Sequence, residues 1–160
     1  AGYGSSIPID RLQTTKDLEF NELKYNSLSS QMSREKIGIS TSNAISSLAN
    51  TLSRFSTDIC LYMSQEFNFI SFPNELTTGS SIMPHKKNPD IFEIIRGRCN
   101  ILKNVPSKLN ILSSNLPSGY HRDMQLSKEI IIDGILEIKE HLKIFAEFIQ
   151  KIKIKKRVGI

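Results

Sequence analysis

The stretch "IIDGILEIKEHLKIFAEFIQKI", residues 131–152, decides the fold class. Its apolar side chains recur without a break at alternating steps of four and three residues, at Ile131, Ile135, Ile138, Leu142, Phe145, Ile149 and Ile152. These steps follow the 3.6-residue turn of an α-helix and therefore place the side chains along one stripe. A stripe of this kind predicts a helix that packs nearly parallel to its neighbours in a bundle.

Two earlier segments carry the same spacing. The predicted stripes are Thr41, Ile45, Leu48, Leu52, Phe55, Ile59 and Tyr62 in the first segment and Ile91, Ile95, Arg98, Leu102, Val105, Leu109 and Leu112 in the second. Pro106 lies inside the second pattern, where it should kink or interrupt the helix because it lacks a backbone N–H. Alternation of the β type is nearly absent, so the sequence predicts an all-α bundle of long helices.

We expect the long helices at residues 33–67, 89–115 and 123–152, with a loop over residues 73–88. A short helix is expected from Arg11 to Phe20, with Asp10 as its N-cap. A helix of about 28 residues is about 42 Å long, which exceeds a compact ball of 160 residues. Further apolar residues lie off the stripes, so we expect an oligomer or a chain that lacks part of itself. The chain does not begin with Met, which favours the second expectation.

Composition excludes several classes of protein. A length of 160 residues with 39% hydrophobic and 23% charged residues is typical of one globular domain. Much of the net charge of +5 lies in "KIKIKKR", residues 151–157, which lacks interleaved aromatic residues, so we expect no nucleic-acid partner. Cys60 and Cys99 form no disulfide or zinc pattern, which favours the reducing cytoplasm. No apolar run is long enough to span a membrane.

The most unusual segment is "TTGSSIMPHKKNPD", residues 77–90. Asn88 followed by Pro89 predicts an N-cap and the first position of a helix. Lys86 precedes that helix start, where the helix dipole disfavours a cation unless an anion is bound. Lys86, Asn88 and the helix start therefore predict a carboxylate or phosphate site. A simple capped turn would explain Asn88 and Pro89 but not the whole segment.

The run "GSSIMPHKKNP", residues 79–89, resembles the signature of the fumarase/aspartase superfamily, Gly-Ser-Ser-x-Met-Pro-x-Lys-x-Asn-Pro. With "LPSGYHRDMQLSKE", residues 116–129, and "SQEFNFI", residues 64–70, the chain is most similar to the argininosuccinate lyases of that superfamily. The resemblance implies the later half of a central helical domain, which forms the helical core of a homotetramer with active sites shared between subunits. It also implies β-elimination of argininosuccinate to arginine and fumarate, in arginine biosynthesis, without a cofactor.

The resemblance assigns roles to individual residues. Ser80 aligns with the catalytic serine, which is generally viewed as the base, and Lys86 and Asn88 align with residues that hold a substrate carboxylate. The family's substrate-binding pattern, Tyr-x-x-Asp-x-Gln-x-x-Lys, is matched by Tyr120, Gln125 and Lys128. Additional contributors near the loop are Ser81, His85 and Arg34. Without the resemblance, Gln125 and Lys128 would be interpreted as exposed surface residues.

Three features depart from the family pattern. His85 stands where glutamine is common, "SREK" at residues 33–36 replaces Ser-x-Arg-Asp, and Leu126 and Ser127 replace two acidic residues. The family's Thr-x-His segment and its early serine- and asparagine-rich region have no counterpart here, and we expect the N-terminal and C-terminal domains to be absent. This chain alone should therefore be nearly inactive. His121 and His141 show no metal-ligand spacing, so no metal is expected.

Two alternatives remain open at this point. The parent protein could cleave another succinyl-amine, such as an acylated argininosuccinate or adenylosuccinate, because the loop signature is common to all these lyases. It could also be a non-catalytic helical assembly module. Ser80, Lys86 and Asn88 argue against the second alternative, since a structural protein has no need of them. We expect Asp123 to cap the last long helix, which would place Gln125 and Lys128 on one face.

Overall fold

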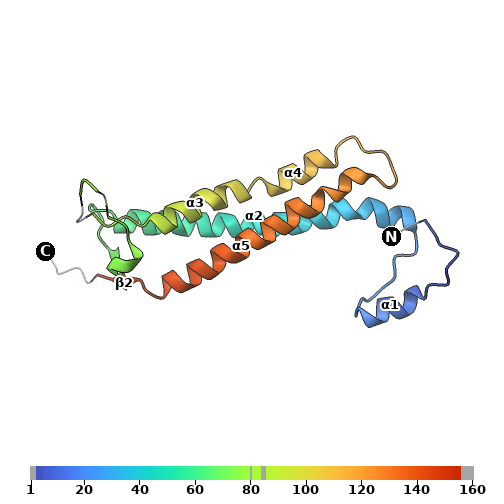
Figure 1. Ribbon diagram of the computed structural model, residues 1–160, viewed down its shortest axis with the longest axis horizontal. Helices are drawn as coiled ribbons and strands as arrows, with labels where there is room; N and C mark the ends of the chain where they lie inside the picture. The colour runs from blue at the N-terminus through green and yellow to red at the C-terminus, as the bar shows by residue number, and fades with distance from the viewer. Residues whose placement is uncertain (1–2, 80, 84–85, 156–160) are drawn as a thin grey trace.

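The computed structural model describes residues 3–79, 81–83 and 86–155. The elements, in chain order, are α1 (Arg11–Asp17), α2 (Ser27–Met63), β1 (Ile70–Ser71), the 3-10 helix η1 (Asn74–Leu76), α3 (Asp90–Leu102), α4 (Val105–Leu112), the 3-10 helix η2 (Arg122–Gln125), α5 (Ser127–Ile149) and β2 (Lys153–Ile154). Long helices dominate the elongated molecule, so the predicted all-α class is confirmed (Figure 1).

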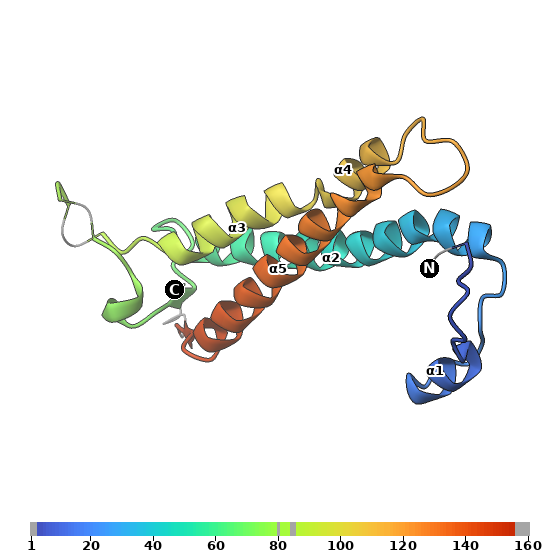
Figure 2. The same ribbon diagram turned by 45° about the vertical axis from the view of Figure 1, so that its right-hand side comes forward.

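The longest helix of the bundle is α2. Its 37 residues correspond to about 55 Å at about 1.5 Å per residue. It starts well before the expected residue 33, because the Asn26 side chain accepts a hydrogen bond from the Ser29 backbone N–H at 2.9 Å and caps the first turn. Helices α3 and α4 follow one another along one side of α2, and α5 runs back alongside them (Figures 1 and 2).

Pro106 divides the segment that the periodicity joins into one helix. Helix α3 ends at Leu102 and α4 begins at Val105, with the proline in the first turn of α4. Proline is tolerated there because the first N–H groups of a helix have no intrahelical partner. The predicted interruption is confirmed.

In each long helix, neighbouring residues replace part of the predicted buried stripe. The buried face of α2 contains Gly38, Ser42, Ile45, Ala49, Leu52, Ser56 and Ile59. It keeps three predicted residues, Ile45, Leu52 and Ile59, but the small residues Ala49 and Ser56 take the places of Leu48 and Phe55, which lie partly exposed beside it. Small residues on the buried face allow the neighbouring helices to approach α2 closely.

Helices α3 and α5 also bury residues adjacent to some of the predicted ones. Phe92 and Cys99 are buried in α3 in place of Ile91 and Arg98. In α5, Gly134 is buried while Ile135 is 41% exposed. A Cβ atom on Gly134 would lie 3.6 Å from Ile45 Cδ1 and 3.7 Å from the Val105 methyl groups, so α5 is in ordinary van der Waals contact with both neighbours there.

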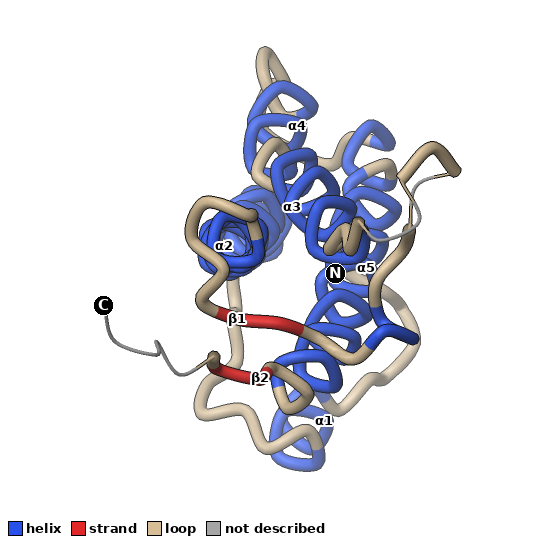
Figure 3. The backbone as a smooth tube through the Cα atoms, turned by 90° about the vertical axis from the view of Figure 1, so that its left-hand side faces the viewer, coloured by secondary structure: helices blue, strands red, loops and turns tan. Residues whose placement is uncertain are grey.

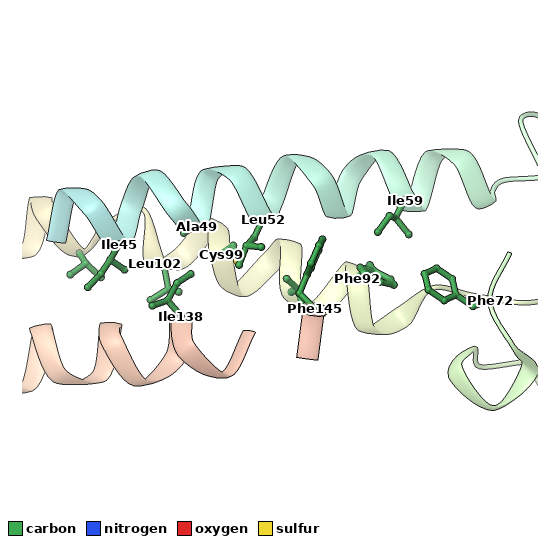
Figure 4. Close-up of a cluster of buried hydrophobic side chains, with 12 residues drawn as sticks. Ile45, Ala49, Leu52, Ile59, Phe72, Phe92, Cys99, Leu102, Ile138 and Phe145 are labelled. Atoms are coloured by element: carbon green, nitrogen blue, oxygen red, sulfur yellow. The ribbon is translucent and has the colours of Figure 1, made fainter. Parts of the chain in front are cut away.

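The core lies between α2, α3 and α5 and ends in a cluster of aromatic rings (Figure 4). The ring of Phe92 lies 5.7 Å from that of Phe145 and 5.9 Å from that of Phe148, both nearly edge to face. Phe72, just after β1, is 4% exposed, and its ring lies 5.2 Å from that of Phe92. Because Phe72 inserts into this core, it anchors the segment that leads into the signature-like loop, which is the stretch 77–89 containing the run "GSSIMPHKKNP".

A short antiparallel sheet joins two distant parts of the chain (Figure 3). Ile70 pairs with Ile154 and Ser71 with Lys153. The helices flanking the sheet end earlier than predicted: α2 ends at Met63 instead of residue 67, and α5 at Ile149 instead of residue 152. The earlier helix ends leave short connections that lead into β1 and β2, and the sheet brings the segment after α5 to the base of the loop.

The predicted helix caps have mixed outcomes. Asp10 caps α1 as predicted, with its Oδ1 accepting from the Gln13 N–H at 2.9 Å, although α1 ends at Asp17 rather than Phe20. Asp123 is not the N-cap of α5: it lies inside η2, and α5 begins only at Ser127. The Asp123 backbone carbonyl accepts from the Leu126 N–H at 3.0 Å, which closes a tighter 3-10 turn in place of the expected α-turn.

Candidate active site

The signature-like loop lies beside the end of α2, between η1 and α3 (Figures 1 and 2). Its neck is closed by an isolated antiparallel bridge: the Asn88 N–H donates to the Thr78 carbonyl at 2.9 Å, and the Thr78 N–H donates to the Asn88 carbonyl at 3.3 Å. The Thr78 hydroxyl also donates to the Asp90 carboxylate. These contacts fix both ends of the loop against the start of α3.

The bridge corrects the predicted role of Asn88 as a helix cap. Pro89 occupies the N-cap position of α3, and no side chain hydrogen-bonds there. Asp90 and Glu93 lie in the first turn of α3, where their carboxylates interact favourably with the helix dipole. The dipole at the start of α3 is therefore already compensated by acidic side chains of the same helix.

A groove of about 650 Å³ lies between this loop, the end of α2 and β1. Lys86, Lys87 and Asn88 line it from the loop side, and Lys155 lines it from the segment after β2. Lys86 is exposed, and its N–H donates to the Met83 carbonyl at 3.0 Å. Asn88 is half-buried. The structure therefore brings together two of the predicted carboxylate-binding residues, Lys86 and Asn88.

The other predicted loop residues are not seen to line the groove. Ser81 is exposed and does not line the groove. Ser80 and His85 lie outside the described residues, so their predicted roles stay predictions.

Glu66 and Glu93 also line the groove, together with Cys60. Burial raises the pKa of the Cys60 thiol, the Arg96 guanidinium lowers it, and the Glu93 carboxylate raises it.

The second predicted segment follows α4. The Gln125 Nε2 donates to the Tyr120 hydroxyl at 3.0 Å, so these two predicted substrate-binding side chains hold each other. Lys128 is exposed in the first turn of α5. His121 Nε2 lies 2.8 Å from the Pro117 carbonyl, and Gly119 has a φ of 133°, which favours glycine. The turn before Tyr120 is thus fixed by local contacts.

The two predicted segments lie at opposite ends of the bundle (Figures 1 and 2). Helices α3 and α4, which separate them, cover residues 90–112, or about 35 Å at about 1.5 Å per residue. Arg34 lies near the start of α2, at the same end as Tyr120 and far from the loop. One copy of this chain therefore does not unite Lys86 and Asn88 with Tyr120, Gln125 and Lys128.

Across residues 3–79, 81–83 and 86–155, no group of three or more His, Cys, Asp or Glu side chains is placed to hold a metal ion. Within the same ranges, no helix combines the length and the apolarity that a membrane crossing requires.

Comparison with known proteins identifies the family. A family model described as "Lyase" matches residues 1–102, which include the whole signature-like loop. The chain belongs to this lyase family.

Individual relatives align with nearly all of this chain. An argininosuccinate lyase of Phocaeicola vulgatus is 46% identical over 158 residues, which are 99% of this chain and 35% of that protein. An argininosuccinate lyase of Bacteroides fragilis is 44% identical over the same shares. One of Clostridium botulinum is 41% identical over 152 residues, 95% of this chain and 32% of that protein. The chain thus spans about a third of the length of the curated relatives it matches.

Two residues that line the groove, Lys155 and Ser64, are not predicted from the sequence. Lys155 belongs to the basic segment 151–157, for which the sequence predicts no site, yet it follows β2 and lines the groove. Ser64 was placed inside a helix predicted to continue to residue 67, but it is the C-cap of α2 and lines the groove. The sheet that positions Lys155 consists of two residues per strand. Such short strands leave no alternation for a pattern to detect.

Proposed function

We propose that the intact protein containing this chain is an argininosuccinate lyase, a carbon–nitrogen lyase of arginine biosynthesis. The observation that carries the proposal is the 46% identity over 158 residues to a protein of that name, a match that includes both predicted site segments. The groove beside the signature-like loop supports it, because Lys86 and Asn88 line the same surface. The activity belongs to the intact protein, of which these residues supply a part.

The proposed reaction is a β-elimination. A base removes a proton from the carbon next to a carboxylate, and the electron pair is delocalised into that carboxylate to give a doubly charged aci-carboxylate. The pair then forms the C=C bond of fumarate as the carbon–nitrogen bond breaks. The leaving guanidino nitrogen of arginine takes up a proton from a general acid, for which the family uses a segment with no counterpart among these 160 residues.

Within this reaction we assign the base to Ser80. A serine alkoxide is costly at neutral pH, so a neighbouring cation such as Lys86 must lower the pKa of the hydroxyl. Lys86 and Asn88 would stabilise the carboxylate where negative charge develops. Removing one preorganised donor of this type typically costs about 3–4 kcal/mol of transition-state stabilisation.

We further propose that each active site combines segments of different copies in a homotetramer. One copy holds the loop and the Tyr120–Lys128 segment about 35 Å apart, so a second, antiparallel copy could supply the missing segment. Exposed apolar rows at seven-residue spacing support such packing; they are Leu48, Phe55 and Tyr62 in α2, Ile94 and Ile101 in α3, and Ile135, Leu142 and Ile149 in α5. These rows would be buried between helices of adjacent copies.

The test is fumarate release by the purified intact protein supplied with argininosuccinate, with adenylosuccinate and an acylated argininosuccinate as competing substrates. Ser80→Ala should lower kcat by at least about 10²–10⁴-fold, with the assembled size unchanged. Substantial residual turnover in Ser80→Ala would reject Ser80 as the base. Preference for another succinyl-amine would reject the substrate assignment, and absence of all turnover would favour the helical assembly module.

The compartment is inferred from thiol chemistry. Cys60 and Cys99 are both free, and Cys99 is buried. Free thiols are typical of proteins kept in a reducing environment, so we infer a cytoplasmic location. Cell fractionation followed by immunodetection of the intact protein would check this location, and recovery from an oxidising compartment would contradict it.

A further inference from the structure

Lys155 is delivered to the groove by a structure that holds both its backbone and its side chain. Its N–H donates to the Phe69 carbonyl at 2.9 Å, which continues the pairing of β2 with β1. Its Nζ donates to the side-chain oxygen of Asn68. Asn68 has a φ of 46° and its own N–H donates to the Ser64 carbonyl at 2.8 Å, so the turn that carries the acceptor is also fixed. The ammonium group is therefore held in a defined place.

The groove gathers more positive than negative charge. Lys86, Lys87 and Lys155 line it, against Glu66 and Glu93. Among the described residues, none of these five side chains is within ion-pair distance of an opposite charge. Three ammonium groups that share one groove repel each other, and an anion bound between them would relieve that repulsion.

One of the carboxylates is already balanced in part. Glu93 and Arg96 lie three residues apart on α3, a spacing that makes side chains neighbours on the helix surface. The guanidinium of Arg96 therefore offsets the Glu93 charge locally. This leaves the side of the groove formed by the lysines as the cationic side.

Ser64 adds an independent indication of a ligand. Its hydroxyl oxygen is buried and has no hydrogen-bond partner within the described part of the chain, although the residue lines the groove. A buried hydroxyl without a partner costs about 1–3 kcal/mol, and proteins seldom leave one unpaired without a reason. The hydroxyl would reach a carboxylate oxygen in the groove by rotation of the Ser64 side chain.

We propose that Lys155 is a further substrate-binding residue, which holds one carboxylate of a four-carbon dicarboxylate in the groove lined by Lys86 and Asn88. This inference rests on the proposed function, because fumarate is the dicarboxylate that the proposed reaction releases. Two carboxylates require two cationic positions, and Lys86 on the loop and Lys155 beside β1 supply them from different elements. A volume of about 650 Å³ is within the usual range for small-molecule sites.

The experiment compares Lys155→Met with Lys153→Met in the intact protein. Both variants remove one positive charge from the same short segment, but Lys153 pairs with Ser71 in the sheet and does not line the groove. The dissociation constant for fumarate is measured by calorimetry at two salt concentrations. Lys155→Met should weaken fumarate binding by about tenfold, whereas Lys153→Met should change it by less than about twofold.

A second readout does not require turnover. Cys60 lines the same groove, so bound fumarate should slow its alkylation by iodoacetamide in the unmodified protein and in Lys153→Met, but much less in Lys155→Met. Equal effects of the two substitutions on binding and on protection would overturn the assignment of Lys155, as would the absence of fumarate binding.

The two proposals fail in different ways. If the intact protein cleaves argininosuccinate but Lys155→Met binds fumarate normally, the Lys155 assignment is wrong and the proposed function stands. If fumarate binding depends on Lys155 but no argininosuccinate is cleaved, the proposed function is wrong, while the dicarboxylate site and the role of Lys155 stand.

Discussion

Tyr120 and Gln125 are oriented before any ligand binds, because the Gln125 amide donates to the Tyr120 hydroxyl at 3.0 Å. Both side chains are exposed, so this hydrogen bond adds little to the stability of the fold. Its value lies in preorganisation, since a ligand would not have to order two free side chains. At the residue scale, the second segment therefore has the character of a binding surface rather than of a core.

Gln125→Ala in the intact protein should raise KM for argininosuccinate by about tenfold and change the free energy of unfolding by less than about 0.5 kcal/mol. The physical reason is that Gln125 is exposed and its partner, Tyr120, can bond to water instead. Steady-state kinetics and thermal unfolding measure the two effects. A large loss of stability with unchanged KM would show that Gln125 has a structural role.

Burial of Cys99 should make the stability of the protein fall at alkaline pH. Burial raises its pKa to about 11, with a further increase from the Glu137 carboxylate and a decrease from the Lys103 ammonium. The folded state favours the protonated thiol, so its stabilising contribution is present below about pH 9 and is lost as the pH rises toward 11. Unfolding measured from pH 8 to 11 should show a smaller loss of stability in Cys99→Val. Equal pH dependence of both proteins would contradict this.

At the scale of elements, contacts between helices depend on small side chains in α2. Ala49 and Ser56 are fully buried, and they alternate with Ile45, Leu52 and Ile59 along the seam with α3 and α5. The larger Leu48 and Phe55 could not lie on this seam without separating the helices. Packing density therefore decides which of two neighbouring stripes turns inward.

Ala49→Leu should destabilise the intact protein by about 1–3 kcal/mol, because the larger side chain overfills a close helix contact. Ala44→Leu is the matched control, since Ala44 is exposed on the same helix and the same atoms are added there. It should change the free energy of unfolding by less than about 0.5 kcal/mol. Chemical denaturation of both variants measures the difference, and equal destabilisation would mean that the seam is not closely packed.

At the scale of the whole molecule, the separation of the two site segments is the property with the largest consequence. Helices α3 and α4 act as a rigid spacer between the loop and Tyr120. The proposed activity then requires assembly, because Ser80 and Gln125 of one copy would serve different active sites.

Mixing Ser80→Ala with Gln125→Ala, two variants with impaired sites, tests this separation at a substrate concentration well below KM. If Ser80→Ala and Gln125→Ala each impair the site that receives them, random mixed oligomers should regain about a quarter of the intact sites. Fumarate release by the mixture, after dissociation and reassembly, is compared with that of each variant treated alone. Recovery of activity supports sites shared between copies, whereas no gain would mean that both residues serve the same site of one chain.

The sequence alone determined the helical class and several boundaries. Four-and-three periodicity reports the turn of an α-helix directly, and the effects of Asp10 and Pro106 arise within one turn of the chain. The loop motif likewise led to the family that the comparison identifies. All of these signals are local, so they survive without knowledge of the tertiary structure.

Only the tertiary structure decided which stripe is buried, how the loop is closed and what lines the groove. Ala49 and Gly134 are buried in place of the predicted Leu48 and Ile135, and this choice depends on how closely the neighbouring helices approach. Asn88 uses its backbone to pair with Thr78, and Lys155 reaches the groove through a sheet whose strands are more than eighty residues apart in sequence. Such contacts depend on packing between distant segments, a property that no local pattern encodes.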